Sequence, residues 1–429
     1  MKVVVHLLRR HWLWPAAIVA ALLLPFAFFD WAHGHHSGFV LVLLSQIGLM
    51  TIFALSYNML MGQSGLLSFG HASLFGLGSY CAAHAMNAVK AGTFWLPTEL
   101  IPLVGGLGGL GFGILLGYLA TKQRATAFAM ITMGMGELIA ACALMFKGFF
   151  GGEDGITTDR VLGTSILGVS YSAPWQVYCL VVAWTAIATL LMRLQTQTPL
   201  GRMANATRDN FERAQFVGYD PRMVRFRQFA ASGFFAGIAG GLYALVYQIV
   251  TFDTMSADTS AAALLAAYIG GSGSFYGPIL GTILVVLLQS GVSLLSNAWM
   301  LYVGALFVIM VMFAPGGLAG LISRHEPIRR IGRLRALLIP YLRLLFPGFI
   351  TVAGTVILVE LTSFATIGSA EGQHLQIGAR SIDPANGMPW LTGAVVLVVG
   401  GVWLRREARN FGVRWNMLIE DAKTKWTRP

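Results

Sequence analysis

Apolar stretches of roughly 20 residues alternate with short polar breaks along nearly the whole chain, from Trp12 almost to Arg405. The hydrocarbon core of a bilayer is about 30 Å thick, and a helix crosses it with roughly 20 apolar residues. The pattern therefore predicts an all-α fold, a polytopic membrane helical bundle with about ten core spans and two C-terminal spans. The predicted spans are residues 12–29, 39–60, 65–89, 99–120, 126–148, 174–192, 229–250, 256–271, 276–295, 299–315, 341–361 and 389–404.

Composition and charge agree with this reading. Hydrophobic residues make up 56% of the chain and charged residues only 11%, which excludes a soluble globular protein. If both termini are cytoplasmic, all of the 29 Lys and Arg residues except Lys90, Lys147, Arg160 and Arg380 fall on the cytoplasmic side. This distribution predicts a multi-pass protein of the bacterial inner membrane with both termini inside.

The net charge of +11 follows from the same distribution. Because the basic residues are spread over many loop ends, the charge predicts attraction to anionic membrane lipid and no nucleic-acid partner.

Metal and redox sites are not predicted. Cys81, Cys142 and Cys179 all lie in apolar spans without CxxC spacing, so we interpret them as small core side chains. The run His33, His35 and His36 has no acidic or thiol partner at ligand spacing, and we interpret it as a solvated loop.

Two predicted spans carry glycine at every fourth residue, which places the glycines of each span on one helix face. Such faces let neighbouring helices approach closely in a membrane. They predict tight bundling without specifying a substrate, and they comprise Gly105, Gly109, Gly113 and Gly117 in one span and Gly233, Gly237 and Gly241 in another.

The first of three distinctive segments is NMLMGQSGLLSFGHASLFGLGSY, residues 58–80. Glycine and polar residues at membrane depth permit a helix break and supply hydrogen-bonding groups to a pathway. We therefore take Gly65, Ser68, Gly70 and His71 as candidate pathway residues. The alternative for His71 is a hydrogen bond to a neighbouring helix without any contact to a solute.

The second segment is the basic polar island RLQTQTPLGRMANATRDNFERAQFVGYDPRMVRFR, residues 193–227. Its pattern predicts one short amphipathic helix over residues 202–216, preceded by Pro199 and Gly201 and ended by Gly218. Such a helix, parallel to the membrane, suits a cleft on a soluble partner. The alternative is a solvated loop whose arginines face lipid.

The third segment is YIGGSGSFYGPILG, residues 268–281, in which Gly271, Gly273, Gly277 and Pro278 predict a structural turn between two apolar stretches. No GxxxxGK[ST] motif occurs in the chain, so we expect no ATP hydrolysis by this chain itself and no cofactor of its own. Glu137, midway along span 126–148, is expected to pair, to be protonated or to face a cavity, which makes it a further pathway candidate.

Together the three segments and FAPGGLAGL, residues 313–321, resemble the integral-membrane permease of branched-chain amino acid ABC importers. The resemblance covers residues 35–322, with the four motifs in the family's order. It implies that residues 193–228 couple the permease to a cytoplasmic ATPase, through Gly201, Arg202, Arg208, Glu212, Ala214 and Gly218. Within that set, Glu212, Ala214 and Gly218 resemble the importer coupling signature, although Arg213 stands where the signature has alanine.

The resemblance also implies partners and a division of the chain. The expected partners are two cytoplasmic ATP-binding subunits, a homologous second permease and a periplasmic substrate-binding protein. Residues 1–322 would form the permease domain, and residues 323–429 a C-terminal extension with a basic linker and two further spans.

We expect a transporter subunit rather than an enzyme, because no nucleophile, base and orienting group occur at usable spacing. Its expected function is alternating-access import of branched-chain or related amino acids. The alternative is a self-contained secondary transporter or channel for a small polar solute such as urea or an amide, with Glu137 and His71 relaying protons.

Overall fold

The computed structural model describes residues 38–426 except 124, 162, 164, 167, 295, 297, 331, 367–374, 378–379 and 383–386, together with residues 21, 29–30 and 35–36. The described part is almost wholly helical, and its contacts divide the chain into two compact units. One unit comprises residues 1–287 and 309–319, and the other comprises residues 288–308 and 320–429.

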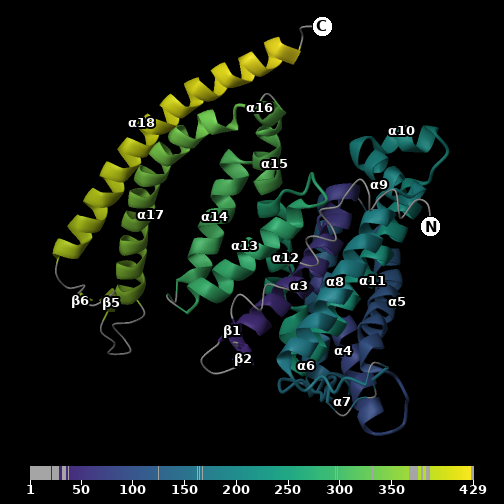
Figure 1. The fold of residues 1–429 in the computed structure, drawn as a ribbon. Helices are drawn as coiled ribbons and strands as arrows, with labels where there is room; N and C mark the ends of the chain where they lie inside the picture. The colour runs from purple at the N-terminus through teal and green to yellow at the C-terminus, as the bar shows by residue number, and fades with distance from the viewer. Residues whose placement is uncertain are drawn as a thin grey trace. The chain divides into compact units, whose positions relative to one another are not determined.

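The first unit contains the long helices of the bundle, together with short helices and strands at its two ends (Figure 1). The long helices are α3 (Gly38–Asn58), α4 (Ala72–Lys90), α5 (Ile101–Ala120), α6 (Ala125–Met145), α8 (Pro174–Gln195), α11 (Pro221–Tyr247), α12 (Ala257–Gly270) and the first part of α13 (Gly277–Val292), whose residues 288–292 belong to the second unit. The short elements are η1 (Met59–Gln63), η2 (Thr98–Leu100), α7 (Lys147–Phe150), β3 (Ile156–Thr157), α9 (Pro199–Asp209), α10 (Phe211–Phe216), β4 (Ile249–Val250) and η3 (Phe252–Met255).

The remaining elements are α14 (Trp299–Phe313), α15 (Gly317–Arg324), α16 (Glu326–Arg330), η4 (Leu334–Leu337), α17 (Leu338–Thr366) and α18 (Gly387–Trp426). Three two-residue or three-residue antiparallel strand pairs complete the fold: β1 (Phe29–Asp30) with β2 (His35–His36), β3 with β4, and β5 (Leu375–Ile377) with β6 (Arg380–Ile382).

The polytopic helical fold is confirmed. Among the described residues, seven helices are long and apolar enough to cross a membrane, or up to eight if the bent pair Trp299–Phe313 and Gly317–Arg329 is one span. Each predicted span from 39–60 onward coincides with a helix, whereas the predicted span 12–29 lies outside the described residues apart from Ala21 and Phe29.

Three predicted boundaries are wrong. The first is the start of span 65–89, because residues 65–71 are not helical and α4 begins at Ala72. Helix α11 begins at Pro221, eight residues before the predicted span 229–250, because the Asp220 side chain accepts a hydrogen bond from Arg222 N at 2.9 Å and Pro221 suits the first helical position. Helix α18 continues to Trp426, far beyond residue 404, because a helix persists into water where its polar residues remain helix formers.

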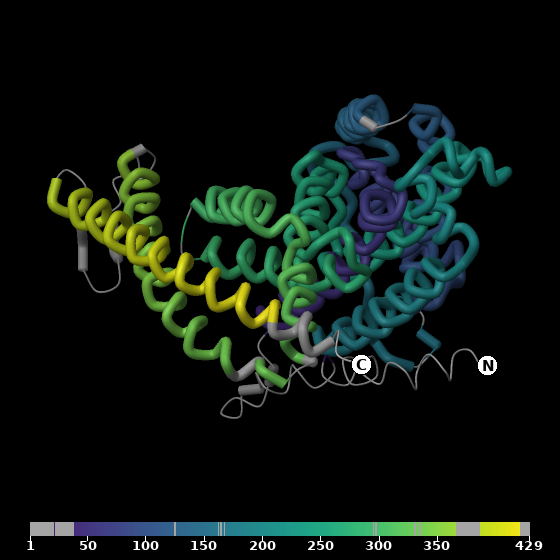
Figure 2. The backbone as a smooth tube through the Cα atoms, turned by 90° about the horizontal axis from the view of Figure 1, so that it is seen from above, coloured from purple at the N-terminus to yellow at the C-terminus, as the bar shows by residue number. Residues whose placement is uncertain are grey.

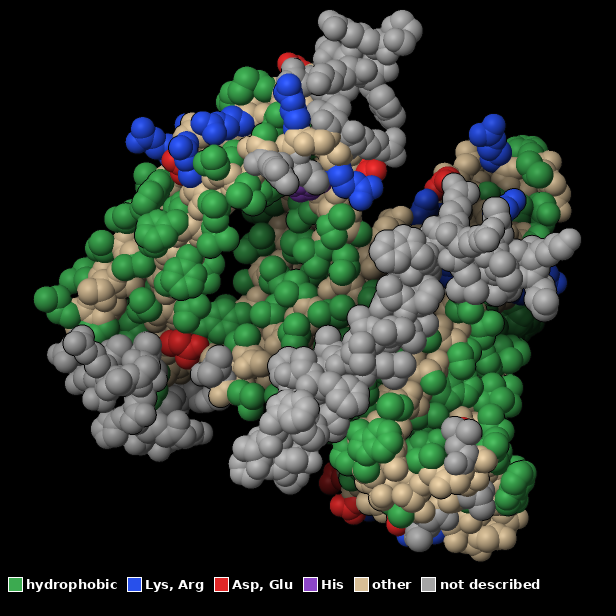
Figure 3. Space-filling view, viewed as in Figure 1, with side chains coloured by type: hydrophobic (Ala, Val, Ile, Leu, Met, Phe, Trp, Pro, Cys, Tyr) green, Lys and Arg blue, Asp and Glu red, His purple; other side chains and the backbone are tan. Residues whose placement is uncertain are grey.

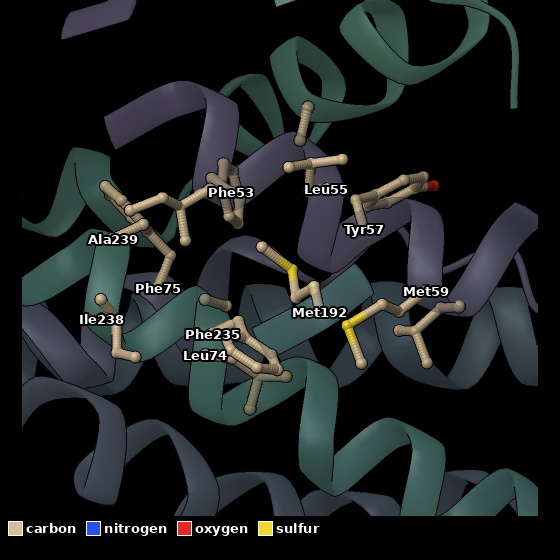
Figure 4. Close-up of a cluster of buried hydrophobic side chains, with 14 of the residues drawn as sticks. Phe53, Leu55, Tyr57, Met59, Leu74, Phe75, Met192, Phe235, Ile238 and Ala239 are labelled. Carbon is tan, nitrogen blue, oxygen red and sulfur yellow. The ribbon is translucent and has the colours of Figure 1, made fainter. Parts of the chain in front are cut away.

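The core of the first unit is formed by α3, α4, α8 and α11. Figure 4 shows Phe53 of α3 near Phe75 of α4, and Phe235 of α11 next to Leu74 of α4, all of them buried. Met192 of α8 lies among these side chains. Lipid is as apolar as these side chains, so their burial gains little from exclusion of water. The core therefore stabilises the bundle through close packing.

The two glycine faces pack against each other, as the sequence predicts. A methyl group added at Gly105 would lie 2.5 Å from Gly237 O, and one added at Gly233 would lie 2.6 Å from Gly109 O. Since residue numbers rise along α5 as they fall along α11, the two helices are antiparallel. Gly78 of α4 joins them, because a methyl group there would lie 2.5 Å from Gly237 Cα.

The end of the bundle opposite α9 and α10 carries the loop between α7 and α8 (Figure 1). Arg160 in this loop donates hydrogen bonds from Nη1 to the carbonyl oxygens of Leu245 and Val246, both at 3.0 Å, and from Nε to Tyr171 O at 2.9 Å. Arg160 thus satisfies carbonyls in the last turn of α11, which have no partner inside the helix. Desolvation by burial lowers the pKa of Arg160.

Glu99 holds the same loop from the start of α5. Its carboxylate accepts hydrogen bonds from Ser165 Oγ at 2.7 Å and from Tyr171 Oη at 3.1 Å. Several causes together raise the pKa of Tyr171 to about 12. Burial is the largest of them, and the hydrogen bond to Glu99 and the negative charge of Glu99 add to it. The loop is therefore fastened to two membrane helices, α5 through Glu99 and α11 through Arg160.

The second unit is dominated by α17 and α18, which run side by side in both views (Figures 1 and 2). Their approach is close at glycines: a methyl group at Gly354 would lie 2.5 Å from Leu397 N, and one at Gly400 would lie 2.8 Å from Thr351 N. Glu360 on α17 accepts a hydrogen bond from Tyr302 Oη at 2.7 Å. A carboxylate in an apolar helix thus has a polar partner.

Candidate functional site

The polar island folds into two helices rather than the single helix predicted over residues 202–216. Helix α9 begins at Pro199, where Thr198 Oγ1 accepts a hydrogen bond from Gly201 N at 3.3 Å. At Asn210 the backbone leaves the helical region, and its side chain accepts a hydrogen bond from Arg213 N at 2.9 Å, which caps α10. Asparagine competes for backbone groups in this way, and it therefore divides the predicted helix.

The tip formed by α10 and the following turn is exposed. Phe216 is 90% exposed and Val217 67% exposed, which is unusual for neighbouring large apolar side chains. Glu212 is exposed as well, and Gly218 has a φ of +89° that suits glycine. Ala214 points inward and is only 3% exposed, so its methyl group contacts this chain rather than facing outward.

Gly201 and Arg202 lie at the other end of the segment, in the first turn of α9. Gly201 is buried, and a methyl group there would be 2.7 Å from Thr196 Cα, so the residue lets α9 fold back closely against the end of α8. Arg202 is exposed beside it.

Helix α3 is interrupted where the first distinctive segment begins. After Asn58 the chain forms a π-helical turn, η1, and Gly65 then adopts a φ of +64°. Leu66 N donates to Leu60 O at 3.1 Å across this turn. A π-helical turn widens a helix locally, and a glycine in the left-handed region changes the direction of the chain. Helix α3 therefore ends in a bend formed by η1 and Gly65.

The three distinctive segments meet at Gly62, inside this bend. Nη1 of Arg208, on α9, donates a hydrogen bond to Gly62 O. A methyl group added at Gly62 would lie 2.5 Å from Ser272 O in the third segment, and one added at Gly65 would lie 2.8 Å from Arg208 Cγ. The exposed α9–α10 segment therefore contacts both the broken membrane helix and, through Gly62, the α12–α13 turn.

Two glutamines that the sequence reading missed hold the same bend. Gln228 Nε2, on α11, donates to Met59 O at 3.1 Å and to Gln63 Oε1 at 3.0 Å. Gln195 Nε2, at the end of α8, donates to Gln228 Oε1 at 2.7 Å. An amide in an apolar helix is costly unless it is paired, and that cost is the signal by which Gln228 could have been found.

His71 lies beyond the bend, completely buried at the start of α4. Its Nε2 is 3.0 Å from Ser56 Oγ, and its ring stacks on Phe53 with centroids 5.5 Å apart. The Tyr57 ring meets it edge-on at 5.4 Å. The predicted hydrogen bond to a neighbouring helix is thus present, from α3, and it leaves the second ring nitrogen for another partner.

Three buried polar atoms in the short stretch from Ser68 to Ser73 have no hydrogen-bond partner among the described residues. They are His71 Nδ1, Ser68 Oγ and Ser73 Oγ. A buried polar atom left unpaired costs about 1–3 kcal/mol, so a concentration of three is a functional signal rather than a packing preference. Gly70, between them, allows α6 to approach closely, since a methyl group there would overlap Thr132 O.

Glu137 does not join this group. Gly136 is the residue of α6 that faces Gly70, because a methyl group added at Gly136 would lie 3.0 Å from Gly70 Cα. Glu137 lies on the exposed side of α6, with Met133 and Leu138. One residue of helix rotates a side chain by about 100°, which separates Glu137 from the His71 group. The expected pairing or cavity is therefore absent among the described residues of this chain.

The turn at residues 271–276 is built by backbone contact between glycines. Gly271 has a φ of +106°, and a methyl group there would overlap Gly316 O of the fourth motif. Gly277 lies against Gly271 O, and Pro278 follows it in the first turn of α13, whereas Gly273 has open space around it. The third and fourth motifs therefore pack together, as the predicted structural role of the turn requires.

No group of three His, Cys, Asp or Glu side chains that could hold a metal ion occurs in the part of the chain that the structure describes. The three cysteines are free thiols.

Comparison with known proteins gives one consistent result. Residues 39–314 match the family described as "Branched-chain amino acid transport system / permease component". The high-affinity branched-chain amino acid transport system permease protein LivM of Escherichia coli K12 is 28% identical over 288 residues, which cover 62% of this chain and 67% of that protein. No solved structure matches the chain significantly.

Two further relatives differ in what their names say they carry. The autoinducer 2 import system permease protein LsrC of Yersinia enterocolitica is 29% identical over 255 residues, 57% of this chain and 67% of LsrC. A probable branched-chain amino acid transport permease protein LivM of Methanocaldococcus jannaschii is 22% identical over 320 residues, 65% of this chain and 92% of that protein. The family match ends at residue 314, so α17 and α18 lie beyond it.

Proposed function

Since this chain belongs to the family of permease components of branched-chain amino acid transport systems, we propose that it is the membrane subunit of an ATP-binding-cassette importer. Its cargo would be a branched-chain amino acid or a related small amphipathic solute. A separate cytoplasmic ATPase supplies the energy, a homologous permease completes the pathway, and a periplasmic binding protein delivers the solute.

The observation that carries this proposal is the convergence at Gly62. Arg208 of the exposed α9–α10 segment donates a hydrogen bond to Gly62 O, and Ser272 of the α12–α13 turn lies against the same glycine. An exposed segment that serves only as a solvated loop has no need of a guanidinium inserted into a membrane helix break. A segment that receives a push from a soluble partner needs such a contact.

The α10 tip is the part of the segment that suits a partner's cleft. Phe216 and Val217 are exposed next to the charged residues Glu212 and Arg213, so an apolar centre is surrounded by polar groups. That arrangement is typical of an interface hot spot with a polar rim. With the termini cytoplasmic, the tip faces the cytoplasm, where the ATPase would bind.

The mechanism follows from these contacts. When the ATP-bound partner closes, it displaces α9, and Arg208 transmits the displacement to η1 and Gly65, where α3 is already bent. The chain from Ser68 to His71 then shifts relative to α6, which changes access to the polar group around His71. Because ATP binds one state of the partner more tightly, it biases the permease between two states.

The test compares two arginines of the same segment in the reconstituted importer. Arg208→Ala removes a charge-assisted hydrogen bond, worth about 1–2 kcal/mol after allowance for the 40% exposure of its side chain, so solute transported per ATP should fall roughly 5-fold to 30-fold. Arg222→Ala removes the same charge at an exposed site outside the α10 tip and should change the ratio less than twofold. Equal effects of both changes would refute a transmitting role for Arg208.

Docking is tested separately at the tip. Phe216→Asp should weaken retention of the ATPase by at least about 30-fold, the value of a typical hot spot, while the permease still inserts and its unfolding temperature is unchanged. Retention is measured by co-purification of the two subunits. Undiminished retention and uptake in Phe216→Asp and in Glu212→Arg would rule out docking at α10.

A further inference from the structure

The hairpin of α17 and α18 lies beyond the family match and has a surface unlike that of a buried helix pair. Both helices are long and apolar enough to cross a membrane. Their outward side chains are exposed apolar residues, namely Leu342, Leu345, Phe346, Phe349 and Val352 on α17 and Val395, Val398, Val399 and Val402 on α18. These faces are suited to contact lipid acyl chains.

At one end of the hairpin the surface changes from apolar to basic. Figure 3 shows Lys and Arg side chains gathered over the part of α18 nearest to α16, next to a surface of hydrophobic side chains on α17 and α18. The sequence accounts for this change, because α18 continues past its apolar part with Arg405, Arg406, Arg409 and Arg414. The change from apolar to basic side chains marks the level of the lipid headgroups.

A groove lies between the two helices at this level. It encloses little space of its own and is open to solvent. Its lining is Pro340 and Arg343 from α17, and Glu407, Asn410, Phe411 and Arg414 from α18. Positions 407, 410, 411 and 414 share one face of α18, because they are spaced by three and four residues.

The groove has unpaired positive charge. Among the residues that the structure describes, Arg343, Arg414 and Glu407 form no ion pair within 4.0 Å. Two guanidinium groups and one carboxylate leave the groove with net charge of +1, and the amide of Asn410 adds a hydrogen-bond donor. Guanidinium groups match phosphate oxygens in geometry and charge.

Aromatic side chains border the groove. The Tyr341 ring is 5.0 Å from the Phe411 ring, and Phe411 stacks on Trp415 at 5.8 Å. His325 completes the set through a hydrogen bond to Tyr341 Oη and an edge contact with Trp415 at 4.9 Å. Tyr and Trp are enriched at the boundary between membrane and water, which independently places the groove at headgroup depth.

We propose that this groove binds the phosphate of an anionic phospholipid. Arg343 and Arg414 hold the phosphate, Asn410 donates to the headgroup, and the acyl chains lie along the exposed apolar residues of α17. The continuity between the basic groove and the apolar faces is what favours a lipid over a soluble phosphate, since a free anion would gain nothing from the apolar side.

The test uses the purified full-length chain in nanodiscs or detergent, with phosphatidylglycerol as the probe and phosphatidylcholine as the neutral reference. Lipid retained per chain is counted by native mass spectrometry across a titration. The double substitution Arg343→Gln and Arg414→Gln should weaken phosphatidylglycerol binding about 30-fold, since each direct contact between a guanidinium and the phosphate contributes roughly fivefold. Phosphatidylcholine binding should not change.

The matched control is Arg405→Gln with Arg409→Gln, which removes the same charge from α18 on the side away from the groove. It should weaken phosphatidylglycerol binding less than threefold. A second variant does not depend on removing arginines: Glu407→Gln removes only the carboxylate of the groove and should tighten binding about fivefold.

Three outcomes would overturn the proposal. Equal losses in both arginine pairs would show diffuse surface attraction instead of a site. Displacement of the lipid by millimolar glycerol phosphate or inorganic phosphate would show a site for a soluble anion. An unchanged affinity in Glu407→Gln would show that the groove does not contact the headgroup.

Discussion

The packing of α5 against α11 allows a prediction whose magnitude can be worked out from the structure. Gly105→Ala would place a methyl group 2.5 Å from Gly237 O and 2.9 Å from Gly241 Cα and N. Ordinary contact begins near 3.4 Å, so the overlap is about 0.9 Å and involves backbone that cannot rotate away. The two helices must separate instead, and a gap of about 0.5–1 Å loses a quarter to a half of each dispersion contact along their length.

Gly111→Ala is the matched control, because Gly111 is on the same helix, six residues further along, with nothing within 4 Å of an added methyl group. Both substitutions gain about 1 kcal/mol of helix propensity, so this contribution cancels between them. Overpacking costs about 1–3 kcal/mol, and we expect a difference of about 2–3 kcal/mol with Gly105→Ala the less stable.

The assay is the thermal unfolding midpoint of the two variants in the same detergent. A difference of about 2–3 kcal/mol corresponds to roughly 4–12 °C for a domain of 150–250 residues, so the larger size of this unit places the expected value toward the lower end. Midpoints within 1 °C of each other would refute the conclusion that glycine is required for the α5–α11 contact.

Two further predictions concern polar residues of the first unit, Tyr171 and Glu137. The pKa of Tyr171 is raised above the ordinary value of 10.0 to about 12, so its neutral form stabilises the loop fully below pH 10, and that contribution is lost as the pH rises toward 12. The ultraviolet difference spectrum between the wild type and Tyr171→Phe should therefore show a phenol titrating near pH 12, and titration at pH 10 would contradict the hydrogen bond to Glu99. Glu137→Gln should leave the unfolding midpoint of the isolated chain within 1 °C of wild type, because Glu137 has no hydrogen bond or ion pair with the described residues; a drop of several degrees would reveal an internal partner.

Hydropathy located the helices well, and most of the predicted ends lie within about three residues of the observed ones. Predicted span 99–120 coincides with η2 and α5, because both of its ends change sharply from apolar to polar. Helix α11 instead starts among Arg222, Arg225 and Arg227, and a polar helical turn has the same composition as a loop. The break at Asn210 was missed for a related reason: amphipathic periodicity continues through it, and only the local hydrogen bond to Arg213 N interrupts the helix.

The candidate site was predicted in its parts but not in its arrangement. The sequence identified the glycine-rich segment, the polar island and the α12–α13 turn because each departs from the composition of a membrane helix. Arg208 and Gly62 are 146 residues apart, and no local pattern relates them. Glu137 shows a further limit of sequence patterns, since a carboxylate in an apolar span indicates a functional position without telling which way the helix face is turned.

The sequence by itself determined that this chain crosses the membrane repeatedly and that α5 and α11 have faces made for close packing. These properties depend on composition and on residues three or four apart, which lie within one helix. Only the tertiary structure decided that Arg208, Gln228 and Ser272 surround one bend in α3, and that Gly136 rather than Glu137 faces Gly70. Those relations depend on the orientation of each helix about its own axis and on its distance from its neighbours. The free energy that selects one orientation comes from packing between segments distant in sequence.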